Sequence, residues 1–323
     1  MTWKVLLCLT GRPRGYILDN KEVKKKSRKQ VPPVTDKPTR PTTKDMPTQT
    51  LPYPAKQSDM ALAPQTDLRG YKPAGKLLGK KAIITGADSG IGRAVALAFA
   101  LEGADVAIVY NENDADAEAT RTMVVLAGRK CLVLKADVRD STACYAAVAR
   151  ATDELGGLNF LVNNAAYQAV QEKLEDISEE QFRRTLETNI FGYFHMAKAV
   201  LPHLAKGDAI VNTGSIVGLV GEPHLIDYCT SKGAIHAFTK ALALNLGPQG
   251  IRVNCVCPGP VWTPNIVGTM TPEDIKTFGG EVALQRPGQP DELAPIYVFL
   301  ASDDASFMTG ALVEVTGGKM SSS

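Results

Sequence analysis

The sequence of 323 residues has few of the side chains that build metal centres and disulfide frameworks. It contains six cysteines and only four histidines, and the histidines do not cluster: they are His195, His203, His224 and His236. The one close pair of cysteines, Cys255 and Cys257, has no further cysteine or histidine nearby in the sequence. Because metal sites need more ligands at set spacings, we expect no metal centre. Free buried thiols are the better interpretation, and they favour a reducing compartment such as the cytoplasm.

Long apolar runs are absent as well. No stretch approaches the roughly 18–20 residues that a membrane span requires. The apolar run near the amino terminus covers only residues 5–9, which is shorter than the roughly 7–15 residues of a secretory signal core. We therefore expect no signal peptide, no anchor and no membrane partner.

Positive charge is scarce outside the amino-terminal tail. Residues 1–45 hold 12 Lys and Arg against 4 Asp and Glu, whereas residues 46–323 hold 24 against 30. The basic cluster at residues 24–29 is compatible with a nuclear or anionic-surface address, although a solvated basic tail is the plainer interpretation. The acidic remainder of the chain excludes nucleic acid as an expected partner.

Residues 20–75 are crowded with Lys, Pro, Thr and Gln. Repeated prolines prevent a regular helix or a central strand, and so few large apolar side chains cannot offset the entropy cost of ordering. We expect residues 1–75 to be a largely disordered or extended arm. No break in composition interrupts residues 76–318, which we interpret as one domain, and residues 319–323 form a short tail.

Apolar strands and helix-period segments alternate through this domain. A strand, a glycine-rich turn, a helix and a second strand follow one another at the start. Further strands are predicted at 131–135, 158–163, 208–213, 251–256 and 311–315, with helices near 141–155, 179–205, 228–247 and 290–301. Apolar strands separated by helices predict an α/β fold: a doubly wound parallel sheet of Rossmann type in three αβα layers.

The glycine-rich turn TGADSGIG, residues 85–92, lies between the first strand and the first helix. Gly86 permits a tight turn, while Gly90 and Gly92 allow close approach of a phosphate and of the sheet. With Ser89 and Ile91, these residues place free N–H groups of the helix amino terminus at the phosphates. The turn predicts a bound dinucleotide, NAD or NADP.

The end of the second strand bears on the choice between these two cofactors. Tyr110 stands where a ribose-binding acid usually lies, so no carboxylate there repels a 2′-phosphate. No Arg or Lys follows to bind one, and Asp88 in the turn is mildly adverse. The sequence therefore leans weakly to NADP and leaves NAD open.

Tyr228 and Lys232 are four residues apart in a predicted helix, so their side chains share one face. An ammonium beside a phenol stabilises the phenolate and is expected to lower the tyrosine pKa below about 10, although a tyrosine packed on a lysine stem is the plainer alternative. Ser215 ends a strand, where its hydroxyl can donate to a substrate oxygen. Asn189 is a polar residue inside an amphipathic helix and has a local hydrogen bond as its plainer explanation.

Residues 76–318 resemble the short-chain dehydrogenase/reductase family. The matching motifs stand in the order TGADSGIG, ADV (136–138), NNAA (163–166), TN (188–189), GS (214–215), YCTSK (228–232) and PGPVWT (258–263). The proline-rich lead-in, the DSGIGRA turn and the segment RPGQPDELAP are similar to those of a bacterial-type subgroup with an amino-terminal arm. On this likeness residues 1–45 look additional, and Met46 is a candidate start.

The resemblance implies a role for each matching residue. Tyr228 would be the general acid/base, Lys232 would lower its pKa and hold ribose hydroxyls, and Ser215 would polarise the carbonyl. Asn189 would distort its helix and hold a water in a proton relay to Lys232. The implied cofactor contacts also include Asp137 and Val138 at adenine, Asn164 at the ribose, Val261 and Thr263 at the carboxamide, and Pro258 and Gly259 beside them. One departure is Ala166, where the family usually has glycine; we expect its methyl group to be accommodated.

The resemblance further implies an oxidoreductase that interconverts an alcohol and a carbonyl compound. Residues 264–284 are expected to form a substrate loop, whose few charges suit a small or medium neutral substrate. A homotetramer is expected, with residues 46–75 lying across a neighbouring subunit. Two other functions stay open: a non-catalytic nucleotide sensor on the same fold, and an interaction protein that works through its basic arm.

Overall fold

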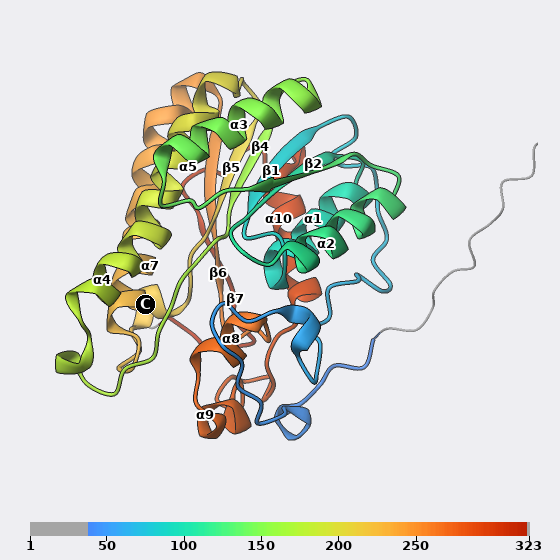
Figure 1. The fold of residues 1–323 in the computed structure, drawn as a ribbon. Helices are drawn as coiled ribbons and strands as arrows, with labels where there is room; N and C mark the ends of the chain where they lie inside the picture. Colours follow the sequence, from blue (N-terminus) through green and yellow to red (C-terminus); the bar gives the residue numbers. More distant parts are fainter. Residues whose placement is uncertain (1–37, 322–323) are drawn as a thin grey trace, which may run out of the picture. The chain divides into compact units, whose positions relative to one another are not determined.

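The computed structural model describes residues 38–321, in which seven parallel strands form one sheet (Figure 1). The strand order is β3-β2-β1-β4-β5-β6-β7. The strands are β1 (Lys81–Thr85), β2 (Asp105–Tyr110), β3 (Cys131–Lys135), β4 (Phe160–Asn163), β5 (Ala209–Thr213), β6 (Arg252–Pro258) and β7 (Leu312–Val315). Each neighbouring pair is parallel, as in β1 with β2 and β1 with β4. The order reverses at β1, so the predicted doubly wound Rossmann-type fold is confirmed.

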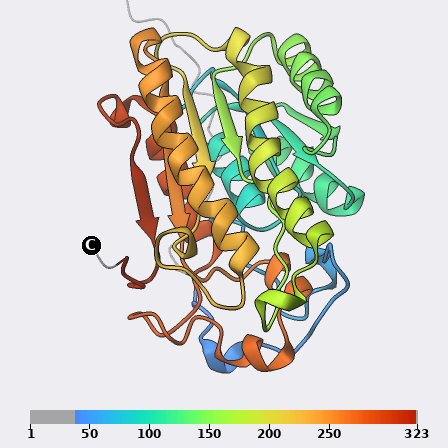
Figure 2. The same cartoon turned by 90° about the vertical axis from the view of Figure 1, so that its left-hand side faces the viewer.

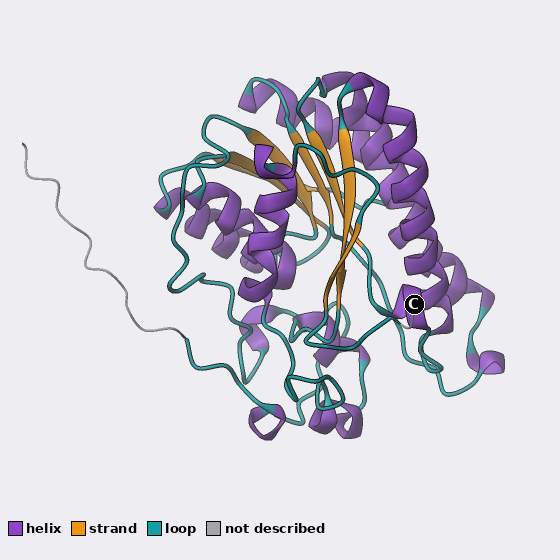
Figure 3. Cartoon of the chain, turned by 180° about the vertical axis from the view of Figure 1, so that it is seen from behind, coloured by secondary structure: helices purple, strands orange, loops and turns teal. Residues whose placement is uncertain are grey.

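Helices cover both faces of this sheet (Figure 3). They are α1 (Gly90–Leu101), α2 (Asp114–Leu126), α3 (Ser141–Leu155), α4 (Glu179–Leu186), α5 (Gly192–Val200), α6 (Val217–Val220), α7 (Ile226–Leu246), α8 (Pro264–Thr269), α9 (Pro272–Thr277) and α10 (Pro290–Ala301). One core cluster joins α1, α2 and α10 to the sheet, and a second joins α3, α5 and α7 to its other face. All residues of β4, β5 and β6 are buried, as expected for strands covered on two sides.

The helix predicted at 179–205 is interrupted in the structure. It is divided into α4, a π-helical segment (Glu187–Phe191), α5 and a short 3₁₀ turn (Leu201–His203). In Figure 2 this run lies beside α7 on the face turned to the viewer. A π-helical turn inserts an extra residue and often marks a functional position. The predicted helix at 290–301 is confirmed at both ends, and the predicted loop at 264–284 contains α8 and α9.

The described part of the arm, residues 38–75, packs on its own chain and is not a free extension. Its backbone is mostly extended and has two short 3₁₀ turns, Thr43–Asp45 and Gln57–Asp59. Met46, Ala55 and Met60 are buried in a cluster with Trp262 and with residues of α8 and α9. Figure 1 shows this blue segment beside both helices. Packing therefore begins well before residue 76, and the placement of residues 46–75 across a neighbouring subunit stays a prediction.

Polar contacts fix the arm at several further points. The Trp262 indole donates to the carbonyl of Leu62 at 2.8 Å, and Arg40 pairs with Asp291 at 2.7 Å. Nearer the sheet, the buried carboxylate of Glu102 accepts hydrogen bonds from the Tyr71 hydroxyl and from the backbone N–H groups of residues 74 and 76. These hydrogen bonds and the ion pair offset the entropy cost of ordering the arm, which its few large apolar side chains could not offset by themselves.

Some expectations fall outside residues 38–321. They concern disorder in the basic tail, the cluster at residues 24–29, the apolar run at residues 5–9, Cys8, and the last two residues of the chain. Among the helices that the structure describes, none has both the length and the apolar character needed to cross a membrane.

Candidate active site

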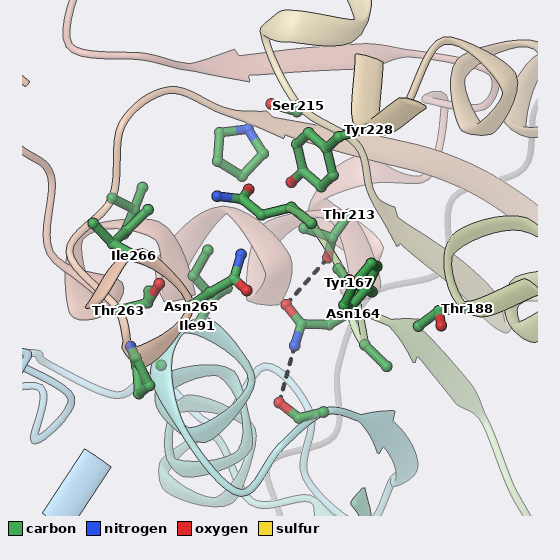
Figure 4. Close-up of a pocket in the computed structure, with 18 of the residues that line it drawn as sticks. Ile91, Asn164, Tyr167, Thr188, Thr213, Ser215, Tyr228, Thr263, Asn265 and Ile266 are labelled. Atoms are coloured by element: carbon green, nitrogen blue, oxygen red, sulfur yellow. Dashed lines mark hydrogen bonds between the residues drawn. The ribbon is translucent and has the colours of Figure 1, made fainter. Parts of the chain in front are cut away.

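The carboxyl ends of the strands open into one cavity of about 520 Å³. Its lining includes residues that end or directly follow six strands, from β1 to β6. Figure 4 shows Ser215 and Tyr228 together on one side of the cavity, across from Ile91, Thr263 and Ile266. This edge of a parallel sheet, next to the point where strand order reverses, is where doubly wound folds bind ligands.

The glycine-rich turn has the backbone geometry that the sequence predicted. Gly86 has a φ of +60°, which favours glycine. A Cβ atom at Gly92 would lie 2.2 Å from the carbonyl oxygen of Gly86, so only glycine allows α1 to pack against the turn. Ser89 occupies the N-cap position of α1, and Gly90 and Ile91 begin the helix at the cavity.

The predicted cofactor residues gather in this cavity with one exception. Those that line it are Gly86, Ser89, Gly90, Ile91, Asp137, Val138, Asn164, Tyr228, Lys232, Pro258, Gly259, Val261 and Thr263. Gly92 is buried behind the turn and does not line it. The Asn164 side chain donates to the carbonyls of Thr85 and Gly86 at 3.1 and 3.0 Å, which ties the turn to the end of β4.

Ser215, Tyr228 and Lys232 form one wall of the cavity. Lys232 is only 1% exposed, and its ammonium donates to the carbonyl of Thr213, at the end of β5, over 2.7 Å. The same Nζ lies 5.4 Å from the centre of the Tyr228 ring. Tyr228 and Lys232 lie one turn apart on α7, so their side chains share one face of the helix. The hydrogen bond from Lys232 to β5 turns this face, and with it the phenol, toward the cavity.

The pKa values of these two groups differ from the expectation. Burial raises the pKa of Tyr228 well above its usual value of 10, with only a partial opposing effect of a hydrogen bond with Ser215. Burial also lowers the pKa of Lys232 to about 8. The expected lowering of the Tyr228 pKa by the Lys232 ammonium is therefore not found in the chain by itself. Desolvation disfavours both charged forms, and the ammonium is directed at a carbonyl rather than at the phenol oxygen.

Asn189 lies in the π-helical segment, is fully buried and does not line the cavity. Its side chain accepts from the N–H of Tyr167 at 2.8 Å, and donates to the carbonyl of Tyr167 and to the Ser231 hydroxyl at 2.9 Å each. The predicted local distortion of the helix is confirmed. These bonds connect three separate segments, so the explanation of Asn189 as a locally bonded helix residue is wrong.

The arm contributes residues to the cavity that sequence reasoning missed. Tyr53, Pro54 and Ala55 line it, and the side-chain oxygen of Gln57 accepts from the N–H of Gly90 at 2.9 Å. The first N–H of α1, expected to be free for a phosphate, is therefore already bonded to the arm. No local motif marks Gln57 for this role, because its partner lies 33 residues away.

A cation stacked on two aromatic rings forms another part of the lining. The Arg184 guanidinium lies 4.4 Å from the centre of the Tyr167 ring and 5.6 Å from that of Tyr53. The two rings meet edge to face at 5.2 Å. Such contacts stabilise by about 0.5–1 kcal/mol at exposed sites and more when desolvated, so they hold the arm to the end of β4.

Asp227 was also missed, although it precedes Tyr228 directly. It is fully buried and accepts from the hydroxyl of Thr185 at 2.6 Å and from the side chain of Gln181 at 3.2 Å. Its other oxygen accepts from the N–H of Tyr228 at 2.9 Å. An acid in the first turn of a helix was the available signal. Through this residue α4 fixes the start of α7, which carries Tyr228.

Two positively charged side chains lie near the end of β2, and they belong to β3 and to the loop that follows it. Sequence analysis did not place them there. Lys135, the last residue of β3, pairs with Asp114 at 2.8 Å and lies over the Tyr110 ring. Arg139 lines the cavity and is bonded to Asp137. Both cations therefore already have an acidic partner at this edge of the cavity.

The lowered pKa of Lys232 predicts a specific pH dependence of stability. Between about pH 8 and 10.5 the unfolded chain keeps the proton that the folded chain has released, so stability rises with pH in this window. The free energy of unfolding of the wild type relative to Lys232→Met should therefore increase by about 3 kcal/mol across it. Denaturant titrations at several pH values measure this. Lys240→Met, at an exposed site on the same helix, should show no such increase. If the difference in free energy of unfolding between the wild type and Lys232→Met stayed constant across this pH range, it would contradict the lowered pKa of Lys232.

The chain has clear relatives among known proteins. The family described as enoyl-(acyl carrier protein) reductase matches residues 86–319. General stress protein 39 of Bacillus subtilis is 48% identical over 276 residues, which cover 85% of this chain and 96% of the relative. Glucose and ribitol dehydrogenase of Daucus carota is 45% identical over 82% of this chain and 93% of its own length. The predicted likeness to a bacterial-type subgroup is confirmed by these matches.

Solved structures agree with them. A short-chain dehydrogenase from Burkholderia cenocepacia in complex with NADP has a TM-score of 0.71 and 32% identity, and covers 75% of this chain and 98% of its own. A 3-ketoacyl-(acyl-carrier-protein) reductase from Brucella melitensis complexed with NADH has a TM-score of 0.68 and 33% identity, over 75% and 99%. Together with the cavity described above, these likenesses place the chain in the short-chain dehydrogenase/reductase family, as an NAD(P)-dependent oxidoreductase.

Proposed function

We propose that the cavity interconverts a small neutral alcohol, such as a sugar or polyol, and the corresponding carbonyl compound. The observation that carries this proposal is the shared wall: Tyr228, Ser215 and Lys232 line the same cavity as the glycine-rich turn. A proton donor, a polarising hydroxyl and a buried cation therefore lie beside the place where a dinucleotide fits. Such groups assist hydride transfer to a carbonyl by protonating and polarising its oxygen.

Each side chain has a separate task in the proposed reaction. Tyr228 gives its hydroxyl proton to the substrate oxygen during reduction and takes it back during oxidation. Ser215 donates a hydrogen bond to the same oxygen as negative charge develops there. Lys232 holds ribose hydroxyls and provides positive charge behind the phenol. Asn189 holds the backbone of Tyr167, and through a water it completes a proton path to Lys232.

The residues around the turn fit an NAD(P) molecule. Gly86, Gly90 and Gly92 give the turn its shape, and the N–H groups of Ser89 and Ile91, two residues that line the cavity, would donate to the phosphates. Asp137 and Val138 would hold the adenine, Asn164 the ribose, and Pro258, Gly259, Val261 and Thr263 the carboxamide end. When bound, the nicotinamide supplies or accepts the hydride; the chain supplies placement and the proton.

The substrate end of the cavity supports a neutral compound. Ile266, Met270 and Phe278 from the segment 264–284 line it and present apolar surface. The charged side chains that line the cavity from this segment, Asp274 and Glu281, are both acidic, which disfavours an anionic substrate. A glucose and ribitol dehydrogenase among the relatives supports a sugar or polyol.

The alternative function, a non-catalytic nucleotide sensor, is not favoured. A sensor needs the glycine-rich turn but has no use for a phenol, a hydroxyl and a buried lysine on the opposite wall. The third hypothesis, an interaction protein that works through its basic arm, concerns mostly residues outside 38–321. Within the described part, Tyr53, Pro54 and Ala55 of the arm line the cavity and Gln57 accepts from the N–H of Gly90, which supports a role of the arm in the enzyme.

Replacement of Tyr228 by phenylalanine tests the proposed function. Tyr228→Phe should lower the rate by about 10²–10⁴-fold, the range for a positioned acid/base, and keep cofactor affinity within a few-fold. The measurements are fluorescence titrations with NADH and NADPH, then turnover of a panel with ribitol, glucose and simple aldehydes. Tyr145→Phe, at an exposed tyrosine on α3, is the matched control and should be as active as the wild type. Cofactor binding by the wild type without turnover of any compound would favour the sensor instead.

Gln57 tests the contribution of the arm to cofactor binding. Gln57→Ala removes the acceptor of the Gly90 N–H and leaves that donor buried without a partner, which costs about 1–3 kcal/mol at the turn. We therefore expect weaker binding of NAD(P)H, by about tenfold, in the same fluorescence titration. Ser58→Ala changes the next, exposed residue and is expected to bind normally. Equal NAD(P)H affinity of the wild type and both variants would show that Gln57 does not contribute to cofactor binding.

We also propose that the protein is a homotetramer in the cytoplasm. Phe191 and Phe194 expose 52% and 45% of their surface at the start of α5, beside a second cavity of about 500 Å³ whose lining includes Phe182 and Leu186. Leu244 on α7 is 82% exposed. Exposed apolar side chains on neighbouring helices are typical of an interface. The free cysteines of the described part support a reducing compartment.

Light scattering at micromolar concentration tests the assembly. The wild type should have four times the mass of one chain, and Phe191→Asp should shift it to smaller species because a buried interface excludes an unpaired charge. Tyr145→Asp, at an exposed aromatic residue on α3, should leave the mass unchanged. Only monomers in the wild type would contradict the tetramer.

A further inference from the structure

Three side chains that bind soft metals meet directly behind the catalytic wall. Cys255 and Cys257 are two residues apart in β6, so both point to the same face of the sheet, and His236 from α7 faces them. Their ligand atoms all lie within 4.8 Å of one another. The cysteines are fully buried and the histidine is 5% exposed. Sequence spacing did not reveal this group because His236 lies in α7, whereas the two cysteines lie in β6.

The distances fit a single ion. In zinc sites the metal–sulfur distance is about 2.3 Å and the metal–nitrogen distance about 2.0–2.1 Å, which places neighbouring ligands about 3.5–4 Å apart at tetrahedral or trigonal angles. Here the two sulfurs are 3.9 Å apart, and His236 Nε2 lies 3.3 Å from the sulfur of Cys257. Small side-chain rotations would bring all three atoms around one metal.

The imidazole is held in place by its surroundings. A Cβ atom at Gly214 would lie 2.5 Å from His236 Nε2, and one at Gly218 would lie 2.7 Å from Cε1, so two glycines make room for the ring. The other nitrogen, Nδ1, is buried and has no hydrogen-bond partner among the described residues. The ring directs Nε2 at the thiol of Cys257, 3.3 Å away.

The charges around the group also suit a divalent cation. Binding would release the two thiol protons and form two metal–thiolate bonds, so one divalent ion leaves the net charge of the cluster unchanged. This matters because the buried ammonium of Lys232 lies in the same region.

The cluster is connected to the catalytic wall. The backbone N–H of Ser215 points at His236 Nε2 over 3.5 Å, and Cys257 directly precedes Pro258 in the cavity lining. A metal bound at Nε2 would take the lone pair that faces Ser215, so the backbone that positions the Ser215 hydroxyl would lose this neighbour.

We propose that His236, Cys255 and Cys257 form a binding site for one thiophilic divalent cation, such as Zn²⁺ or Cd²⁺, and that its occupation inhibits the enzyme. The inhibition rests on the role proposed for Ser215, whereas the binding does not. The two parts of the proposal therefore have separate tests.

Binding is tested with Cd²⁺ on the full-length chain after treatment with a chelator and a thiol reductant. The wild type should show an ultraviolet thiolate-to-cadmium absorption band that the double variant Cys255→Ala/Cys257→Ala lacks. Its affinity for Cd²⁺ should exceed that of the variant by more than about 100-fold. Alanine keeps the core apolar, and thermal unfolding checks that the variant folds. Cys144→Ala, at a buried cysteine on α3, is the matched control and should keep the band. An equal band in the wild type and the double variant would overturn the site.

Inhibition is tested separately, by adding one equivalent of Zn²⁺ to each protein in the turnover assay. The wild type and Cys144→Ala should lose at least about tenfold in rate and recover it with chelator, while the double variant should respond little. Cadmium binding without any loss of rate would overturn the inhibition. A loss that only a thiol reductant reverses would indicate oxidation of the cysteines and would overturn the metal site. If the protein turns over no compound at all, the Cd²⁺ titration still decides the binding.

Discussion

The hydrogen bond from the Lys232 ammonium to the Thr213 carbonyl holds the site together. It buries a charge at the junction of α7 and β5, where the Thr213 carbonyl is the one acceptor it has among residues 38–321. A buried lysine stays charged only if its surroundings hold the hydrogen-bond acceptor in place, since a buried charge without a partner costs several kcal/mol. The rest of the wall follows from this contact. Tyr228 lies one helical turn before Lys232, and Ser215 lies two residues after Thr213 along the chain.

Rigidity at that junction is supported from outside by residues that never line the cavity. Asp227 ties the first turn of α7 to α4, and Asn189 joins the π-helical segment to Tyr167 and to Ser231 in α7. On the opposite side, Gln57 from the arm holds the first turn of α1. The two walls of the cavity are thus fixed by different parts of the chain. A site built in this way keeps its geometry without depending on loop residues alone.

The sequence predicted those features that follow from local pattern. Strands, most helix boundaries and the glycine-rich turn are encoded in short runs of residues, and the Tyr228–Lys232 pair needs only helical spacing. The missed features all depend on contacts between distant segments. The packing of residues 38–75, the stack of Tyr53, Tyr167 and Arg184, and the meeting of His236 with Cys255 have no local signature. The interruption of the helix at 187–191 was predicted only in part. The family resemblance implied a distorted helix there, whereas hydrophobic periodicity predicted an unbroken one.

Burial acts on the two titrating groups of the wall in opposite directions, and this separates their roles. With its pKa raised, Tyr228 keeps its proton at neutral pH, and in the proposed reaction it would give this proton to the substrate oxygen during reduction of a carbonyl. Lys232, with a pKa near 8, is still mostly charged at pH 7 but loses its charge within one to two pH units above it. Oxidation of an alcohol needs the phenol to accept a proton, and the protein's own environment opposes the phenolate. In the proposed reaction, positive charge near the phenol would favour that step, and Lys232, whose Nζ lies 5.4 Å from the centre of the Tyr228 ring, would supply it while it is protonated.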